Sequence, residues 1–187
     1  MRIAFKEWAV VVDALGHGEQ ILILRKGGIS EKRDGFQVEH PEFLLLPTLY
    51  HQQRESVIAP AQARFDQLAH ALPPSEIARL EYYAVVTHWR LLESRSAAES
   101  LRGQHIWSDT VIANRYDWGR AKNIHALALR VHRLPRVIEL PMLPQYGGCT
   151  SWVELERDIP VAGGQPVLDQ AAYDRKVQQF LSALNAD

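Results

Sequence analysis

The stretch QILILRKGGISEKRDGFQVEHPEFLLLPTLYHQ, residues 20–52, decides our prediction of the fold. Its first apolar run ends in two cations and a double glycine, and its second, residues 43–46, ends at Pro47. Short apolar runs between turn residues are typical of strands. The stretch therefore predicts two strands whose ends bring cations, glycines, carboxylates and histidines to neighbouring points, where they would form a site.

The segments on either side extend this sheet. Residues 8–15 (WAVVVDAL) are apolar and β-branched, which predicts a strand that forms a hairpin with residues 20–24. The run at 78–92 predicts a strand by its residue types, although its length also permits a helix. The other segments expected in the sheet are residues 36–38, 43–46, 123–134 and 151–156, and residues 135–149 are expected to form a loop.

Helices are expected between and after these strands. Pro60 suits the first position of a helix, and Ser108 suits the residue that caps one. The expected helices are residues 60–71, 96–102, 109–116 and 168–184. An apolar stripe would dock the last helix on the core, and it consists of Tyr173, Val177, Phe180, Leu181 and Leu184. Four tryptophans are also expected in the core: Trp8, Trp89, Trp107 and Trp152.

Together the elements predict one globular α+β domain over residues 1–187. Its sheet of five to seven strands would be mixed or mostly antiparallel, or a partly closed barrel, with packed helices and a C-terminal helix. A chain of this length buries roughly 70% of its unfolded surface, so it needs no disulfide to hold its core.

The composition of the chain predicts a cytoplasmic protein. No apolar run approaches the ~20 residues that cross a membrane, and the first residues lack the features of a signal peptide. The single cysteine, Cys149, excludes an intramolecular disulfide, and we expect it to be a small buried residue. The net charge of −1 is not that of a basic nucleic-acid-binding protein.

The charge is nevertheless uneven along the chain. Residues 79–136 hold ten Lys or Arg against five Asp or Glu, whereas both ends are acidic. Cations neutralise phosphates, and aromatic rings stack on unpaired bases. The alternative is that these cations only solvate the surface. The candidates for nucleic-acid binding are Arg25, Lys26, Arg115, Trp118, Arg120, Lys122, Arg130 and His132.

A second group of residues suggests metal chemistry. Carboxylates and imidazoles near a lysine can hold Mg²⁺ and activate water against a phosphodiester. The spacing matches no nuclease or zinc motif, and charges are expected in polar loops anyway. The candidates for catalysis are Lys26, Glu31, Glu39, His40 and His51, with Mg²⁺ only under this alternative and no cofactor otherwise.

Several blocks of the chain resemble one bacterial family. They are FKEWAVV at 5–11, LRKGGISE at 24–31, VEHPEFLLLPTLYHQ at 38–52, HIWSDTVIANRYDW at 105–118, ALALRVHRLP at 126–135 and YGGCTSWVEL at 146–155. Over about residues 5–156 the chain resembles the family catalogued as domain of unknown function 1802. The family has no assigned activity. The occurrence of some members beside a restriction-endonuclease domain of the Mrr type implies a role in restriction-modification.

Three functions therefore stay open. The first is an accessory nucleic-acid-binding module, for DNA or RNA, linked to restriction-modification or defence. The second is a metal-dependent phosphodiesterase or nuclease. The third is a protein-interaction module that binds another chain through its sheet, which a large exposed apolar patch would favour.

Overall fold

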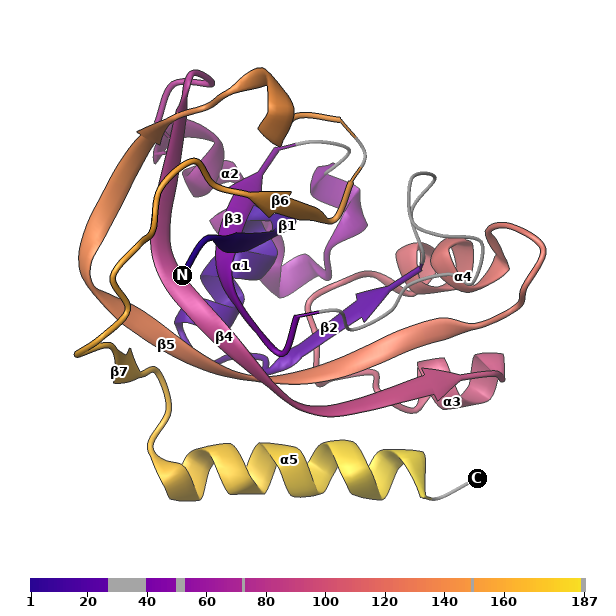
Figure 1. The fold of residues 1–187 in the computed structure, drawn as a ribbon. Coiled ribbons are helices and arrows are strands. Elements are labelled where there is room, and N and C mark those ends of the chain that lie inside the picture. Colours follow the sequence, from indigo (N-terminus) through magenta and orange to yellow (C-terminus); the bar gives the residue numbers. More distant parts are fainter. Residues whose placement is uncertain (27–39, 50–52, 72, 149, 186–187) are drawn as a thin grey trace.

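The computed structural model describes residues 1–26, 40–49, 53–71, 73–148 and 150–185 (Figure 1). Within them one seven-stranded mixed sheet has the order β2-β5-β4-β3-β1-β6, and β7 pairs with β5. Its strands are β1 (Ile3–Trp8), β2 (Leu22–Arg25), β3 (Glu42–Thr48), β4 (Ile77–Leu92), β5 (Ile124–Pro141), β6 (Trp152–Glu154) and β7 (Gln165–Pro166).

Five helices accompany the sheet in the described ranges. They are α1 (Ala9–Gly16), α2 (Ala59–Ala71), α3 (Arg95–Glu99), α4 (Asp109–Asp117) and α5 (Gln170–Leu184), and the two short 3-10 turns are η1 (Arg54–Ser56) and η2 (Pro144–Tyr146). The predicted fold class is confirmed: the protein is α+β, with a curled mixed sheet, a half-barrel, and a C-terminal helix.

The long antiparallel pair β4 and β5 makes the curl. Their ladder shifts register between Leu80 and Tyr82 and again between Val86 and His88. Such irregularities bend strands and increase their twist, so the pair wraps round the rest of the sheet, as Figure 1 shows. Pro135 lies in a stretch of β5 without ladder partners on β4, where its missing N–H costs no ladder bond.

The hairpin predicted from residues 8–15 is wrong. Those residues form α1, which follows β1 directly, and β1 itself was not predicted. Seven of the eight residues of α1 are buried, so the run shows neither the period of a helix nor that of a strand. β1 pairs in parallel with β3, and parallel neighbours need a crossover, which begins with α1.

Most of the other predicted elements are confirmed. The strand at 78–92 is β4, and the helices at 60–71, 109–116 and 168–184 match α2, α4 and α5 within two residues. The loop predicted at 135–149 is wrong in its first half, because β5 continues to Pro141. Trp107 is buried as expected, but Trp89 is 44% exposed, and the short strand predicted at 36–38 lies outside the described residues.

The helix α5 lies along β4 and β5 (Figure 1). Its predicted stripe points at the core: Tyr173, Val177 and Phe180 are buried, and Phe180 is fully so. From β5, the Arg130 guanidinium lies 4.4 Å from the centre of the Tyr173 ring. The Tyr173 hydroxyl adds a hydrogen bond with Thr87 Oγ1 at 2.5 Å.

Replacement of Phe180 by alanine should lower the free energy of unfolding by about 3–5 kcal/mol, because it leaves a cavity under α5. Urea denaturation monitored by circular dichroism measures this change. The matched control is Val137→Ala on the surface of β5, which should change the value by less than about 0.5 kcal/mol. Equal effects of the two substitutions would mean that α5 does not pack as described.

Candidate functional site

A cleft of about 840 Å³ opens where the parallel strands β1 and β3 end. Its floor comes from the end of β1 and its walls from the ends of β3, β5 and the segment after α2. Its lining includes Lys6, Glu7, Trp8, Arg25, Thr48 and Leu49, together with Pro47, Met142, Leu143, Tyr146, Gly147, Gly148 and Thr150.

Glu7 is a fully buried carboxylate at this floor. Its Oε1 accepts a hydrogen bond from the Trp8 backbone N–H at 2.8 Å, and Thr48 Oγ1 donates to the Glu7 carbonyl at 3.4 Å. Its Oε2 lies 3.7 Å from Nη1 of Arg25 but accepts no hydrogen bond from the described residues. Among the described residues, Oε1 is therefore hydrogen-bonded, whereas Oε2 has only the ion pair with Arg25.

Arg25 connects the two edges of the sheet. It is the last residue of the edge strand β2, yet its Nη2 donates to Ser151 Oγ at 2.7 Å, beside the opposite edge strand β6. Its guanidinium also lies 5.0 Å from the centre of the Phe5 ring on β1. The curl of the sheet brings these edges together, and Arg25 closes the half-barrel with one side chain.

Lys6 shapes the wall of the cleft. Its Nζ donates to the carbonyls of Tyr146, Gly147 and Gly148 at 3.1, 2.9 and 2.8 Å. An ammonium group has three hydrogens to donate. Lys6 therefore fixes the turn after η2 against β1, and it is only 8% exposed.

Arg115 lies behind the cleft, between two tryptophans. Its guanidinium is 4.9 Å from the Trp8 ring and 4.8 Å from the Trp107 ring, and it donates to the Leu24 carbonyl at 2.7 Å. Burial lowers the pKa of Arg115 to about 10, against the opposing effect of Glu7. The stack ties α4 to β1 and β2 and fixes the orientation of Trp8 at the cleft.

Lys26 ties the end of β2 to the connection between α4 and β5. Its Nζ donates to the carbonyls of Tyr116 and Asn123 at 3.3 and 2.7 Å, and also to that of Ala121. Burial, and secondly the charge of Lys122, lower the pKa of Lys26. This ammonium thus supports the connection rather than presenting a free charge.

The connection itself carries exposed side chains. Trp118 is 50% exposed, and Arg120 and Lys122 are exposed as well. Lys122 donates to the Asp117 carbonyl at 2.5 Å, whereas Arg120 has no partner among the described residues. Gly119 has φ +74°, which suits glycine and sets the sharp exit from α4. Six predicted nucleic-acid candidates are therefore neighbours: Arg25, Lys26, Arg115, Trp118, Arg120 and Lys122.

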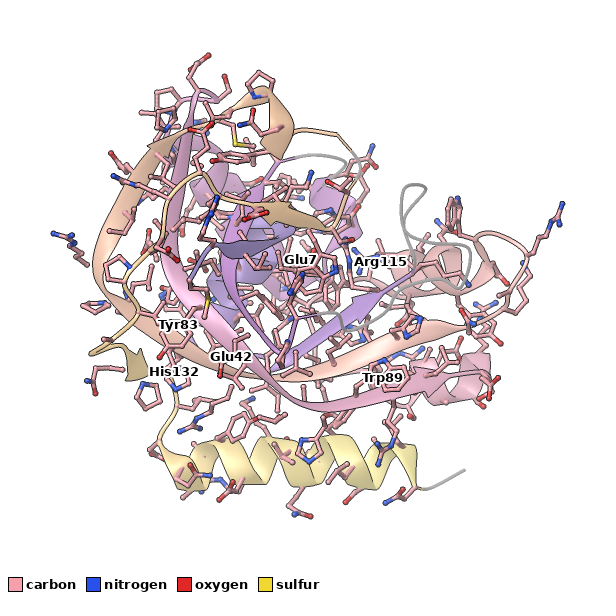
Figure 2. The ribbon with its side chains drawn as sticks, in the orientation of Figure 1. Glu7, Glu42, Tyr83, Trp89, Arg115 and His132 are labelled. Carbon is pink, nitrogen blue, oxygen red and sulfur yellow. The ribbon has the colours of Figure 1, made fainter. Side chains whose placement is uncertain are left out.

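Arg130 and His132 lie elsewhere. Arg130 stacks on Tyr173 of α5 at 4.4 Å, and His132 stacks on Tyr83 at 4.7 Å. Figure 2 places His132 and Tyr83 apart from Glu7 and Arg115. Burial, with the Arg130 charge, lowers the pKa of His132. Neither residue lines the cleft, so these two of the eight predicted nucleic-acid candidates lie apart from it.

The candidates for metal chemistry are only partly described. Glu31, Glu39 and His51 lie outside the described residues. His40 packs edge-on against Trp152 at 5.2 Å, and Lys26 is engaged as above. Within the described part of the chain, no three His, Cys, Asp or Glu side chains gather as a metal site would require.

The sequence prediction missed Lys6, Glu7 and Thr48. A signal was present, because Lys6 and Glu7 are two charges next to an apolar run at residues 8–12. Charged residues are rarely buried unless they are paired or functional. Because the sequence predicts no element before residue 8, it gives no reason to expect Lys6 and Glu7 inside the fold, whereas both lie on β1.

Comparison with known proteins assigns the chain to a family. The model of the family described as Domain of unknown function (DUF1802) matches residues 4–179, so the chain belongs to that family. No curated protein matches it. A solved structure, the crystal structure of ASCH from Zymomonas mobilis, is similar over 96% of this chain and 93% of that chain, at 8% identity and a TM-score of 0.49. A likeness at that score carries no conclusion about function.

None of the described helices is both long and apolar enough to cross a membrane.

The stability of the wall behind the cleft should depend on pH through His105. This side chain is 5% exposed and lies 5.5 Å from Trp107, and burial lowers its pKa from 6.5 to about 4. The unfolded chain binds a proton more readily, so stability is present above pH 6.5 and falls as the pH drops towards about 4. The loss attributable to His105 should be about 3 kcal/mol.

Urea denaturation of the wild type and of His105→Asn at pH 7 and pH 4 measures this loss. The wild type should lose more stability on acidification than the variant does. An identical fall in both proteins would show that another group is responsible.

Proposed function

We propose that the protein binds single-stranded nucleic acid along a surface that runs from the cleft to the connection between α4 and β5. The observation that carries this proposal is the position of Lys26, which holds that connection beside Arg25. The exposed Trp118 and Arg120 thereby lie on the connection that Lys26 ties to the end of β2, where Arg25 lines the cleft.

The residue types on this surface suit an unpaired strand. Arginine and lysine neutralise phosphates without regard to sequence, and an exposed indole offers a flat surface to an unstacked base. A duplex hides its base faces and would leave Trp118 without this role. The chain as a whole has a net charge of −1, so binding would depend on this local surface.

Within this proposal the protein is an accessory module, consistent with the restriction or defence context that the family resemblance implies. No observation on the described residues favours the phosphodiesterase alternative, since the carboxylates it needs lie outside them.

Fluorescence anisotropy with labelled single strands of DNA and RNA, about 12 nucleotides long, tests the proposal. Affinity should fall at least tenfold, on the order expected for a few phosphate contacts, when salt rises from about 50 to 200 mM. Trp118→Ala and Arg120→Ala should each weaken binding about tenfold, through lost stacking and lost phosphate contact.

The matched control is Arg157→Ala, which removes an exposed arginine after β6, by the start of β1 and away from the cleft. It should leave the affinity within about twofold of the wild type. Absence of binding at low salt, or equal losses in the control and in Arg120→Ala, would overturn the proposal.

A further inference from the structure

We infer that the cleft receives a single unpaired base, whose polar edge contacts Glu7 and Arg25. The inference rests on the proposed function, because the strand would deliver the base. It goes beyond that function by naming the group that enters the cleft and the atoms that contact it.

Two buried polar atoms at the cleft carry the inference. Glu7 Oε2 and Arg25 Nε are both buried, and neither has a hydrogen-bond partner in the described part of the chain. An unsatisfied buried donor or acceptor costs about 1–3 kcal/mol, more for charged groups. Both residues line the cleft, and Glu7 Oε2 lies 3.7 Å from Arg25 Nη1. A ligand in the cleft would satisfy both atoms once the two side chains turn towards it.

The chemistry of the two atoms selects the ligand. A carboxylate oxygen only accepts, and a guanidinium nitrogen only donates. The charges of the two side chains offset each other, with Glu7 Oε2 at 3.7 Å from Arg25 Nη1, which disfavours a phosphate or an ammonium ion between them. A neutral group that presents an N–H beside a carbonyl or ring nitrogen complements the pair, and the hydrogen-bonding edge of a nucleobase has this arrangement.

The remaining walls suit the faces of a base. Pro47, Leu49, Met142 and Leu143 give the cleft an apolar side, and Trp8 adds an aromatic ring. A base has two apolar faces and a polar edge, so it would pack against this side with its edge towards Glu7. The volume of about 840 Å³ falls within the usual range for small-molecule sites, ~300–1,000 Å³.

A purely structural role for the Glu7 and Arg25 pair makes a different prediction. Arg25 joins β2 to Ser151, and Glu7 Oε1 holds the Trp8 N–H, so both residues also support the fold. In that case Glu7→Gln would lower stability and weaken all oligonucleotides alike. A base in the cleft instead makes the effect of the substitution depend on the presence of the base.

The experiment crosses Glu7→Gln with a change in the ligand. Labelled strands of abasic sugar-phosphate carry one central base, A, C, G or T, and a fully abasic strand of equal length and charge is the reference. For the wild type, the preferred base should raise affinity about tenfold or more over the reference, the worth of one hydrogen bond to a charged group. Glu7→Gln should reduce that gain to within about twofold, measured against the variant's own affinity for the abasic strand.

Two further arms keep the test decisive. The control Glu99→Gln on the surface of α3 should retain the gain. If Glu7→Gln does not fold, the wild type is compared with its preferred base and the analogue methylated at the donor nitrogen, which should bind no better than the abasic strand.

The outcomes separate the two proposals. Binding of the abasic strand with no gain from any base would refute the base-binding inference and leave the proposed function in place. An equal gain in the wild type and in Glu7→Gln would refute it too. Failure of the wild type to bind any strand would remove both.

Discussion

The contact of Arg25 with Glu7 and Ser151 is the interaction on which the rest of the structure depends. In the sheet order, β2 and β6 are opposite edges, separated by four strands, yet Arg25 of β2 reaches Ser151 beside β6 at 2.7 Å. The irregular β4 and β5 ladder permits the curl, and Arg25 holds its two ends together. The carboxyl ends of β1 and β3 meet there, so the side chain that closes the half-barrel also lines the cleft.

This arrangement places charges where a globular protein usually avoids them. Lys6 and Glu7 are 8% and 1% exposed, and burial of a charge is costly unless it is paired. Lys6 offsets the cost with three carbonyls, whereas Glu7 and Arg25 each keep one atom without a hydrogen bond from any residue that the structure describes. A pair that served stability alone would be expected to satisfy both atoms. The incomplete bonding therefore points to a ligand, and the exposed connection held by Lys26 lies on its path.

Elements with a clear period or cap could be predicted from sequence, including β4, β5, α2, α4 and the apolar stripe of α5. The passage from β1 into α1 could not, because a run buried on all sides carries no period and its β-branched residues favour a strand. Of the predicted site residues, Arg25, Lys26 and Arg115 lie near the connection that carries Trp118 and Arg120, and their role stays a prediction. The floor of the cleft was missed: Lys6, Glu7 and Thr48 become neighbours only through the parallel pairing of β1 with β3, which local sequence does not encode.

The central claim is that the cleft at the ends of β1 and β3 binds one base of a single-stranded nucleic acid. A crystal structure with a short oligonucleotide bound tests this claim most directly. The account predicts one base in the cleft within hydrogen-bond distance of Glu7 Oε2, and the sugar-phosphate chain leaving past Arg120. An oligonucleotide bound instead beside α5, against Arg130 and His132, with the cleft vacant, would contradict it.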